Sequence, residues 1–176
     1  AEGTSFDTIA ASGSNSSLPH AMPQPKLLTE GDFLTMDFGC MYQGYCSDMT
    51  RTIFMGCILE EIKPVYDLAL KNLELSTKEI TDGYTIKTAA NMVESDFKVN
   101  GYNLIHALGH GVGLEVHELP FIRLKNEANF KENMVIADEP GIYLPGKYGI
   151  RIEDTLLVTK DGSERLTKSE RGYVVI

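Results

Sequence analysis

The apolar positions divide the chain into two regions of strand-like pattern with a helical region between them. From Phe33 to Met55 the chain is rich in Phe, Tyr, Thr, Ile and Met, and the turn residues Gln43-Gly44 interrupt it near the middle. A second β-rich pair, Val135–Tyr143 and Tyr148–Thr159, is joined by Leu144-Pro145-Gly146-Lys147. Because turn residues between two such runs are typical of hairpins, the pattern predicts one hairpin in each region.

Between the hairpins, apolar residues recur at spacings of three and four. This periodicity predicts a helix from about Glu60 to Ile80, in which Pro64 is tolerated because it lies in the first turn. Thr85 is expected to cap a second helix that ends at Gly101. The glycine-dense stretch Gly109–Glu118 predicts a strand with a close backbone approach. Together these elements predict an α+β protein.

The composition suits one globular domain. The chain has 176 residues, of which 43% are hydrophobic, so it can bury a core without disulfides. Its net charge of −9 repels phosphate backbones and anionic lipids, so neither nucleic acid nor membrane is an expected partner. Without an apolar stretch long enough to span a bilayer, we expect a soluble, cytoplasmic protein. The acidic excess also permits carboxylates gathered around a divalent cation.

The three cysteines, Cys40, Cys46 and Cys57, lack the paired short spacings of a zinc ribbon or a redox couple. We interpret them as buried free thiols of a reducing compartment.

Acidic residues interrupt both hairpins within otherwise apolar strands. Folding the first hairpin about its turn is expected to place Asp37 opposite Asp48, and folding the second about Gly146 places Glu139 opposite Glu153. Two carboxylates about 5 Å apart repel by roughly 3 kcal/mol at an effective dielectric near 20. Such pairs favour a metal ion between them. The alternative is a register shifted by one residue, which would move one acid of each pair to the solvent face.

A histidine changes which metal these acids would suit. His110 lies among glycines, and a lone histidine is more often a hydrogen-bonded structural residue. His106 and His117 are equally unremarkable by themselves. Sites made only of oxygen suit Mg or Ca, whereas four carboxylates with one imidazole suit Mn, Fe, Co or Zn.

These segments resemble the pita-bread metallopeptidases, specifically the Xaa-Pro branch of aminopeptidase P and Xaa-Pro dipeptidase (prolidase). The matching motifs follow in family order from about Phe6 to Thr167: Ala11-Ser12-Gly13, Leu18-Pro19-His20-Ala21, Asp37-Phe38-Gly39, Gly44 to Thr52, Gly109-His110-Gly111, Val116-His117-Glu118, Glu139-Pro140-Gly141-Ile142-Tyr143 and Arg151-Ile152-Glu153-Asp154.

The resemblance implies a curved antiparallel sheet with helices packed on one face. It also implies an exopeptidase that hydrolyses the bond between an N-terminal residue and a following proline through a bridging hydroxide. The cofactor would be two divalent metal ions, with Mn favoured and Co or Zn as alternatives. A peptide with proline at its second position would be the substrate, and a homodimer is a further expectation.

The resemblance also assigns roles to single residues. Asp48 and Glu153 would bridge the two metals, and Glu139 would serve both as ligand and as proton acceptor. His117 would stabilise the oxyanion. The full expected set is, for the metals, Asp37, Asp48, His110, Glu139 and Glu153; for catalysis, Glu139 and His117; and for the substrate, His20 and His106.

Two neighbours of these residues have alternative interpretations. Arg151 would brace a ligand carboxylate, or else be an ordinary strand charge. Tyr143 matches the family, although an interior aromatic residue is the simpler account.

The sequence departs from the family pattern in two ways. Elements that precede the family's motifs would lie before Ala1, so we expect residues 1–176 to be a partial catalytic domain that lacks the preceding helices and an N-terminal domain. Ala137-Asp138 replaces a threonine and an aliphatic residue, and we expect Asp138 to face the helices with a partner or exposure. The alternative function is an inactive remnant of the fold that binds peptides or proteins without cutting them.

Overall fold

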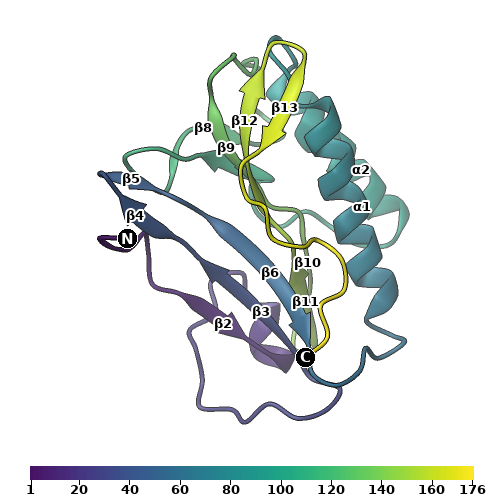
Figure 1. Cartoon of the computed structure of the whole chain (residues 1–176). Coiled ribbons are helices and arrows are strands. Elements are labelled where there is room, and N and C mark those ends of the chain that lie inside the picture. Colours follow the sequence, from purple (N-terminus) through teal and green to yellow (C-terminus); the bar gives the residue numbers. More distant parts are fainter.

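The computed structural model describes residues 1–176 and places two helices along one side of a set of antiparallel strands (Figure 1). The helices are α1 (Lys63–Glu79) and α2 (Ile86–Val99), and a short 3-10 helix, η1, covers Gly13–Ser17. This arrangement confirms the α+β prediction. No helix is both long enough and apolar enough to cross a membrane.

The first hairpin region contributes to two small sheets. In both sheets the two arms of the hairpin pair about the same turn, so one register holds along its length. The central strand is β3 (Phe33–Phe38), which pairs with β2 (Ile9–Ala11) and β6 (Met49–Phe54). Towards the tip the second sheet contains β1 (Gly3–Thr4), β4 (Cys40–Tyr42) and β5 (Tyr45–Cys46).

The predicted register of this hairpin was wrong by two residues. Tyr42 pairs with Tyr45 around a two-residue turn, and this pairing sets Asp37 opposite Thr50 instead of Asp48. In the turn, Gln43 and Gly44 both have positive φ angles of 50° and 78°, as a tight hairpin turn requires. Because side chains alternate with a period of two, the shift leaves Asp48 on the same face as Thr50.

The second half of the chain forms a five-stranded sheet in the order β13-β12-β9-β7-β8 and one further hairpin. Asp138 pairs with Asp154, and Gly141 pairs with Arg151, so Glu139 and Glu153 lie opposite each other as predicted. The strands are β7 (Gly109–Gly111), β8 (Glu118–Ile122), β9 (Val135–Asp138), β12 (Asp154–Thr159) and β13 (Gly162–Arg165), with β10 (Gly141–Leu144) and β11 (Tyr148–Arg151) in the hairpin.

The helices begin and end close to the predicted positions. Pro64 lies in the first turn of α1, and α2 is followed by Gly101 with a φ angle of 83°. Thr85 occupies the N-cap position in an extended conformation, but its hydroxyl bonds Asn129 and does not cap the helix.

Both helices bury an apolar face against the strands. The buried side chains of α1 and α2 form one cluster with strand residues, which has 22 members and includes Leu73, Phe97, Ile136 and Ile150.

The cysteine prediction was partly wrong. All three thiols are free, but Cys40 and Cys57 are exposed and Cys46 is half-buried. They lie on β4, on β5 and after β6, outside the cluster that forms the core.

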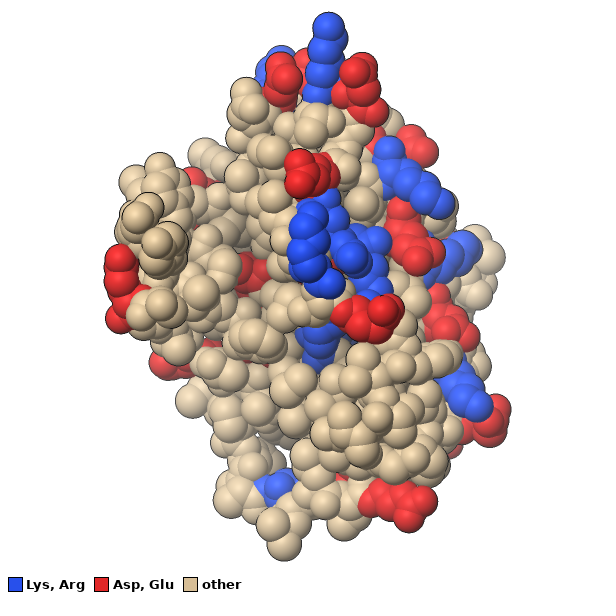
Figure 2. Space-filling view, in the orientation of Figure 1, with Lys and Arg blue, Asp and Glu red and all other residues tan.

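Charged side chains on the face seen in Figure 2 gather over its upper and right-hand parts, while the lower left is largely uncharged. Of the 25 acidic residues, several lie inside the molecule: Asp37, Asp48, Asp138, Glu153 and Asp154 are all buried. Part of the acidic excess is therefore internal.

A substitution tests the close approach at β7. A Cβ atom at Gly109 would lie 1.9 Å from the carbonyl oxygen of Ala137, so Gly109→Ala forces two paired strands apart. We expect the free energy of unfolding, measured by urea denaturation, to fall by about 1–3 kcal/mol. Gly162→Ala is the control, since a Cβ there meets nothing within 4 Å. Equal stability of the two variants would contradict the prediction.

Candidate metal centre

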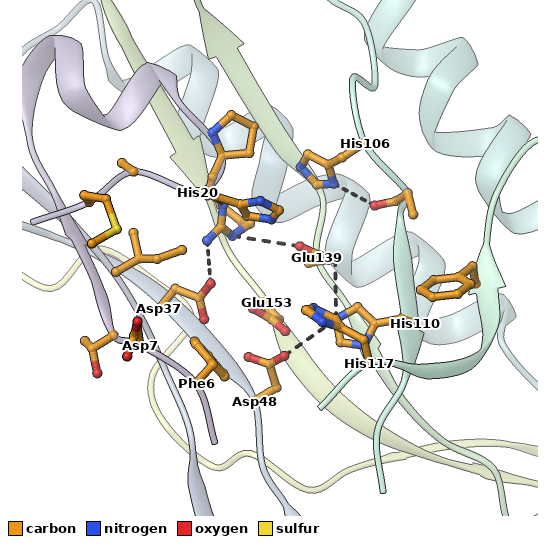
Figure 3. Close-up of a pocket in the computed structure, with 18 of the residues that line it drawn as sticks. Phe6, Asp7, His20, Asp37, Asp48, His106, His110, His117, Glu139 and Glu153 are labelled. Atoms are coloured by element: carbon orange, nitrogen blue, oxygen red, sulfur yellow. Dashed lines mark hydrogen bonds and ion pairs between the residues drawn. The ribbon is translucent and has the colours of Figure 1, made fainter. Parts of the chain in front are cut away.

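One cavity of about 540 Å³ receives all the residues that the sequence singled out as a site (Figure 3). Asp37 comes from β3 and His110 from β7. Asp48 immediately precedes β6, and the two glutamates lie where β9 passes into β10 and β11 into β12. The predicted residues on the cavity wall are His20, Asp37, Asp48, His106, His110, His117, Glu139, Arg151 and Glu153.

The tightest group is formed by Asp48, His110 and Glu153. One ligand atom from each lies within 4.8 Å of the others, and all three residues are buried. The Nε2 atom of His110 is 3.6 Å from Asp48 Oδ2 and 3.7 Å from Glu139 Oε1. Its Nδ1 atom lies 3.0 Å from the carbonyl oxygen of Gly111, so Nδ1–H donates there and Nε2 keeps a free lone pair.

Three of the acidic residues each have one buried oxygen without a hydrogen-bond donor, and in two of them the other oxygen accepts a hydrogen bond. Arg151 Nη2 donates to Asp37 Oδ2 at 2.6 Å, and Thr50 Oγ1 donates to Glu153 Oε2 at 2.6 Å. The oxygens Asp37 Oδ1, Asp48 Oδ1 and Glu153 Oε1 are buried without a donor. Buried acceptor oxygens are rarely left unpaired. These oxygens, together with the His110 nitrogen, are therefore suited to bind divalent cations.

The electrostatics of the cavity point the same way. Burial, with the negative charges of Glu153 and Asp37, raises the pKa of Asp48 to about 10. Burial also raises the pKa of Glu139 to about 8, although the Arg151 guanidinium lowers it. Divalent cations would remove this penalty by favouring the charged forms.

His110 is suited to ligation because it is neutral. Burial lowers the pKa of its imidazole to about 4, so the ring is unprotonated at pH 7. A ligating histidine must be neutral, and no proton has to leave this one before a metal binds.

Arg151 makes four hydrogen bonds in the wall of the cavity, one of them to the carboxylate of Asp37. It is 3% exposed and donates to Thr50 Oγ1 at 3.1 Å, to Tyr143 OH at 2.8 Å and to the carbonyl oxygen of Pro19 at 2.9 Å, besides Asp37. Sequence reasoning missed Thr50, although its alternation with Asp48 on one strand was a usable signal. It also treated Tyr143 as an interior aromatic residue, whereas the hydroxyl belongs to this network.

The remaining histidines lie around the acids. His106 is held by the carbonyl oxygen of Ala107 at 2.6 Å and by Tyr143 OH at 3.1 Å, and burial lowers its pKa to about 4. His117 stacks edge-on against His110, with ring centroids 4.4 Å apart. His20 is exposed and lies on the same side of the acids as His106 in Figure 3.

A family model described as "Metallopeptidase family M24" matches residues 1–160, which include every residue of the cavity. The chain belongs to metallopeptidase family M24. The M24 fold is confirmed by the crystal structure of X-Pro aminopeptidase from Thermotoga maritima, with a TM-score of 0.96 and 42% identity over 100% of this chain and 51% of that one. The predicted pita-bread architecture is therefore correct.

Other M24 relatives carry related names. Xaa-Pro dipeptidase of Pyrococcus horikoshii is 45% identical over 99% of this chain and 50% of its own length. The prolidase structure from Pyrococcus furiosus has a TM-score of 0.91 and 44% identity over 95% of this chain and 50% of that one. The chain spans about half the length of the relatives it matches.

The departure at Ala137-Asp138 from the expected M24 pattern has a structural answer. Ala137 pairs with His110 across β9 and β7. Asp138 points the opposite way, towards α1, where Ser76 Oγ donates to its Oδ2 at 2.5 Å. The expected partner is therefore present, but Asp138 Oδ1 has none, and burial raises the pKa of this acid to about 7.

Removing the charge of Asp138 should stabilise the metal-free protein at high pH. Since its pKa is about 7 in the folded protein and near 3.8 otherwise, the folded state holds the proton more tightly. That stabilisation is complete below about pH 3.8 and is lost as the pH rises towards 7. Asp138→Asn stays neutral, so we expect its gain in unfolding free energy to be larger at pH 8, by about 1–3 kcal/mol, than at pH 5.

Urea denaturation at both pH values measures this effect. Asp161→Asn is the matched control, because Asp161 is exposed and should change stability little at either pH. A gain that does not depend on pH would contradict the assignment.

Proposed function

We propose that this chain carries the active site of a dinuclear metal-dependent exopeptidase that cleaves between an N-terminal residue and a following proline. The observation that carries the proposal is the ring of four carboxylates and one imidazole, in which three buried oxygens have no donor. The residues that would hold two divalent cations, with manganese favoured, are Asp37, Asp48, His110, Glu139 and Glu153.

The chemistry divides between the cations and the chain. Divalent cations lower the pKa of a coordinated water to about 7 and polarise a carbonyl oxygen. Glu139 has its Oε1 3.7 Å from His110 Nε2 and its Oε2 4.0 Å from Arg151 Nε, and its side chain is 17% exposed on the cavity wall. From this place it accepts the proton of the attacking water and passes it to the leaving amine.

His117 is the donor for the developing oxyanion. It lies against His110, is exposed to the cavity and makes no side-chain hydrogen bond within the chain, so its N–H is available. A donor aimed at the place where charge develops stabilises the transition state more than the substrate.

His106 and His20 receive the proline end of the substrate. His106 is fixed by Ala107 and Tyr143 and is neutral, so it presents a rigid polar edge, whereas His20 lies at the open side. Proline has no N–H, and its ring fixes the backbone, so a site can select it by shape. The relatives' names, Xaa-Pro dipeptidase and X-Pro aminopeptidase, support this substrate class.

Metal titration tests the ligand set. Isothermal titration of the metal-free protein with MnCl₂ should find two ions per chain and a rise in melting temperature, because ligands that bind only the folded state stabilise it. His110→Ala should lose at least one ion. A wild-type protein that binds no Mn²⁺ would favour the inactive remnant instead.

Turnover of Ala-Pro and of a longer Ala-Pro-Xaa peptide by the Mn²⁺-loaded protein tests the reaction and the substrate length together. His117→Ala should reduce kcat by about 10²–10³-fold. Its Mn²⁺ affinity should not change, because His117 is not a ligand. Wild-type turnover no greater than that of Glu139→Ala would contradict the proposal.

A homodimer and a cytoplasmic location stay predictions.

A further inference from the structure

The proposed ligands are divided between two sheets that no strand ladder joins. Asp37 and Asp48 belong to the sheet β2-β3-β6 and its margin, whereas His110 belongs to the sheet β13-β12-β9-β7-β8, and the two glutamates adjoin β9 and β12 of that sheet. We call the line where β6 meets residues 151–155 the seam. The distance between the two groups of ligands therefore depends on the bonds that cross the seam.

Several hydrogen bonds cross the seam. The amide of Glu153 donates to the carbonyl oxygen of Thr50 at 3.1 Å, and Thr155 Oγ1 donates to the carbonyl oxygen of Asp48 at 2.7 Å. Thr52 Oγ1 donates to the carbonyl oxygen of Arg151 at 3.0 Å. Each of these is a single hydrogen bond across the seam.

Arg51 makes five hydrogen bonds behind the cavity, and two of them, to Glu153 and Asp154, cross the seam. It follows Thr50 on β6, does not line the cavity and is 5% exposed. Its Nη1 atom donates to the carbonyl oxygens of Thr50 at 2.8 Å and of Glu153 at 2.5 Å. One guanidinium nitrogen thus joins the backbone beside Asp48 to the backbone of Glu153 itself.

The other donors of Arg51 fix its orientation. Nη2 donates to Asp154 Oδ1 at 2.6 Å and to the carbonyl oxygen of Ser169 at 3.1 Å, and Nε donates to the carbonyl oxygen of Glu170 at 2.8 Å. All five N–H groups therefore have an acceptor, as the planar fork of arginine permits.

The C-terminal segment, residues 166–176, supplies the remaining acceptors around Arg51. Figure 1 shows it passing from β13 across the molecule to end near β6, where Val175 bridges Phe54. Asp154, fully buried, also accepts bonds from Thr167 Oγ1 and Arg171 Nε of this segment.

We propose that Arg51 is a positioning residue that sets the separation of the two ligand groups across the seam and thereby the affinity for the cations. The inference rests on the proposed function, since it assumes that these ligands hold metal. Metal sites tolerate deviations of only about 0.2 Å in the distance between ligand and metal. A hydrogen bond that fixes the backbone of Glu153 should therefore affect the affinity for the cations. Lysine has one compact ammonium group on a flexible stem and cannot bond all five acceptors at once.

Arg51→Lys tests this role. Substituting a residue that hydrogen-bonds a metal ligand typically lowers the affinity for the metal 10–100-fold. We expect Arg51→Lys to weaken Mn²⁺ binding in that range, measured by isothermal titration. The visible absorption spectrum of the Co²⁺-loaded variant should also differ from that of the wild type, because it reports ligand geometry directly.

Tyr66→Phe is the matched control. The Tyr66 hydroxyl donates to the carbonyl oxygens of Arg171 and Gly172 at 2.9 and 3.0 Å, so the variant loosens the same C-terminal segment without crossing the seam. It should lower the melting temperature but keep the Mn²⁺ dissociation constant within twofold and leave the Co²⁺ spectrum unchanged. An equal loss of affinity in Tyr66→Phe and Arg51→Lys would reduce Arg51 to a structural residue and overturn the inference.

A second variant covers the case in which Arg51→Lys does not fold. Asp154→Asn keeps the size of the side chain and weakens the anchor of Arg51, so a smaller loss of Mn²⁺ affinity is expected. If the variant that folds keeps the Mn²⁺ affinity of the wild type, the positioning role of Arg51 is overturned, while the proposed function stands. A wild-type protein without Mn²⁺ binding overturns the proposed function, and this inference with it.

Discussion

The structure depends on keeping four carboxylates close together in a space that water reaches poorly. Two such charges about 5 Å apart repel by roughly 3 kcal/mol at an effective dielectric near 20, and burial adds a desolvation cost to each. Arg151 is the only cationic side chain bonded to this group, through Asp37. Burial, together with the neighbouring negative charges, raises the pKa values of Asp48 and Glu139. Bound cations would offset this cost by favouring the charged carboxylates.

The two faces of the strands differ: one packs against the helices, and the other lines the cavity. At β9 the chain turns Asp138 towards Ser76 of α1 and turns the next residue, Glu139, into the cavity. The helices bury the apolar face, so the opposite face is left for the polar site. Backbone ladders join the strands within each sheet, and hydrogen bonds of both backbone and side chains join β6 to residues 151–155.

Membership of family M24 accounts for the cavity but not for everything that supports it. The family match covers residues 1–160 and so contains all the proposed ligands. The carbonyl oxygens of Ser169 and Glu170, which orient Arg51, lie beyond residue 160. The support of the centre therefore extends into a segment that the family motifs do not mark.

The sequence by itself determined the elements and, through its motifs, the candidate ligands. Local periodicity located both helices, and turn residues located both hairpins, because these signals arise from neighbours along the chain. The same local logic gave the register of the second hairpin. It failed by two residues in the first, where a two-residue turn sets Asp37 opposite Thr50.

Only the tertiary structure decided how the candidate ligands are held. Thr50 meets Glu153 across 103 positions of sequence, and Arg51 meets Ser169 across 118. No periodicity links such residues, because their proximity comes from the packing of two sheets and a C-terminal segment around one core. Exposure of the cysteines was decided in the same way, since burial depends on what packs against a strand and not on the strand's own composition.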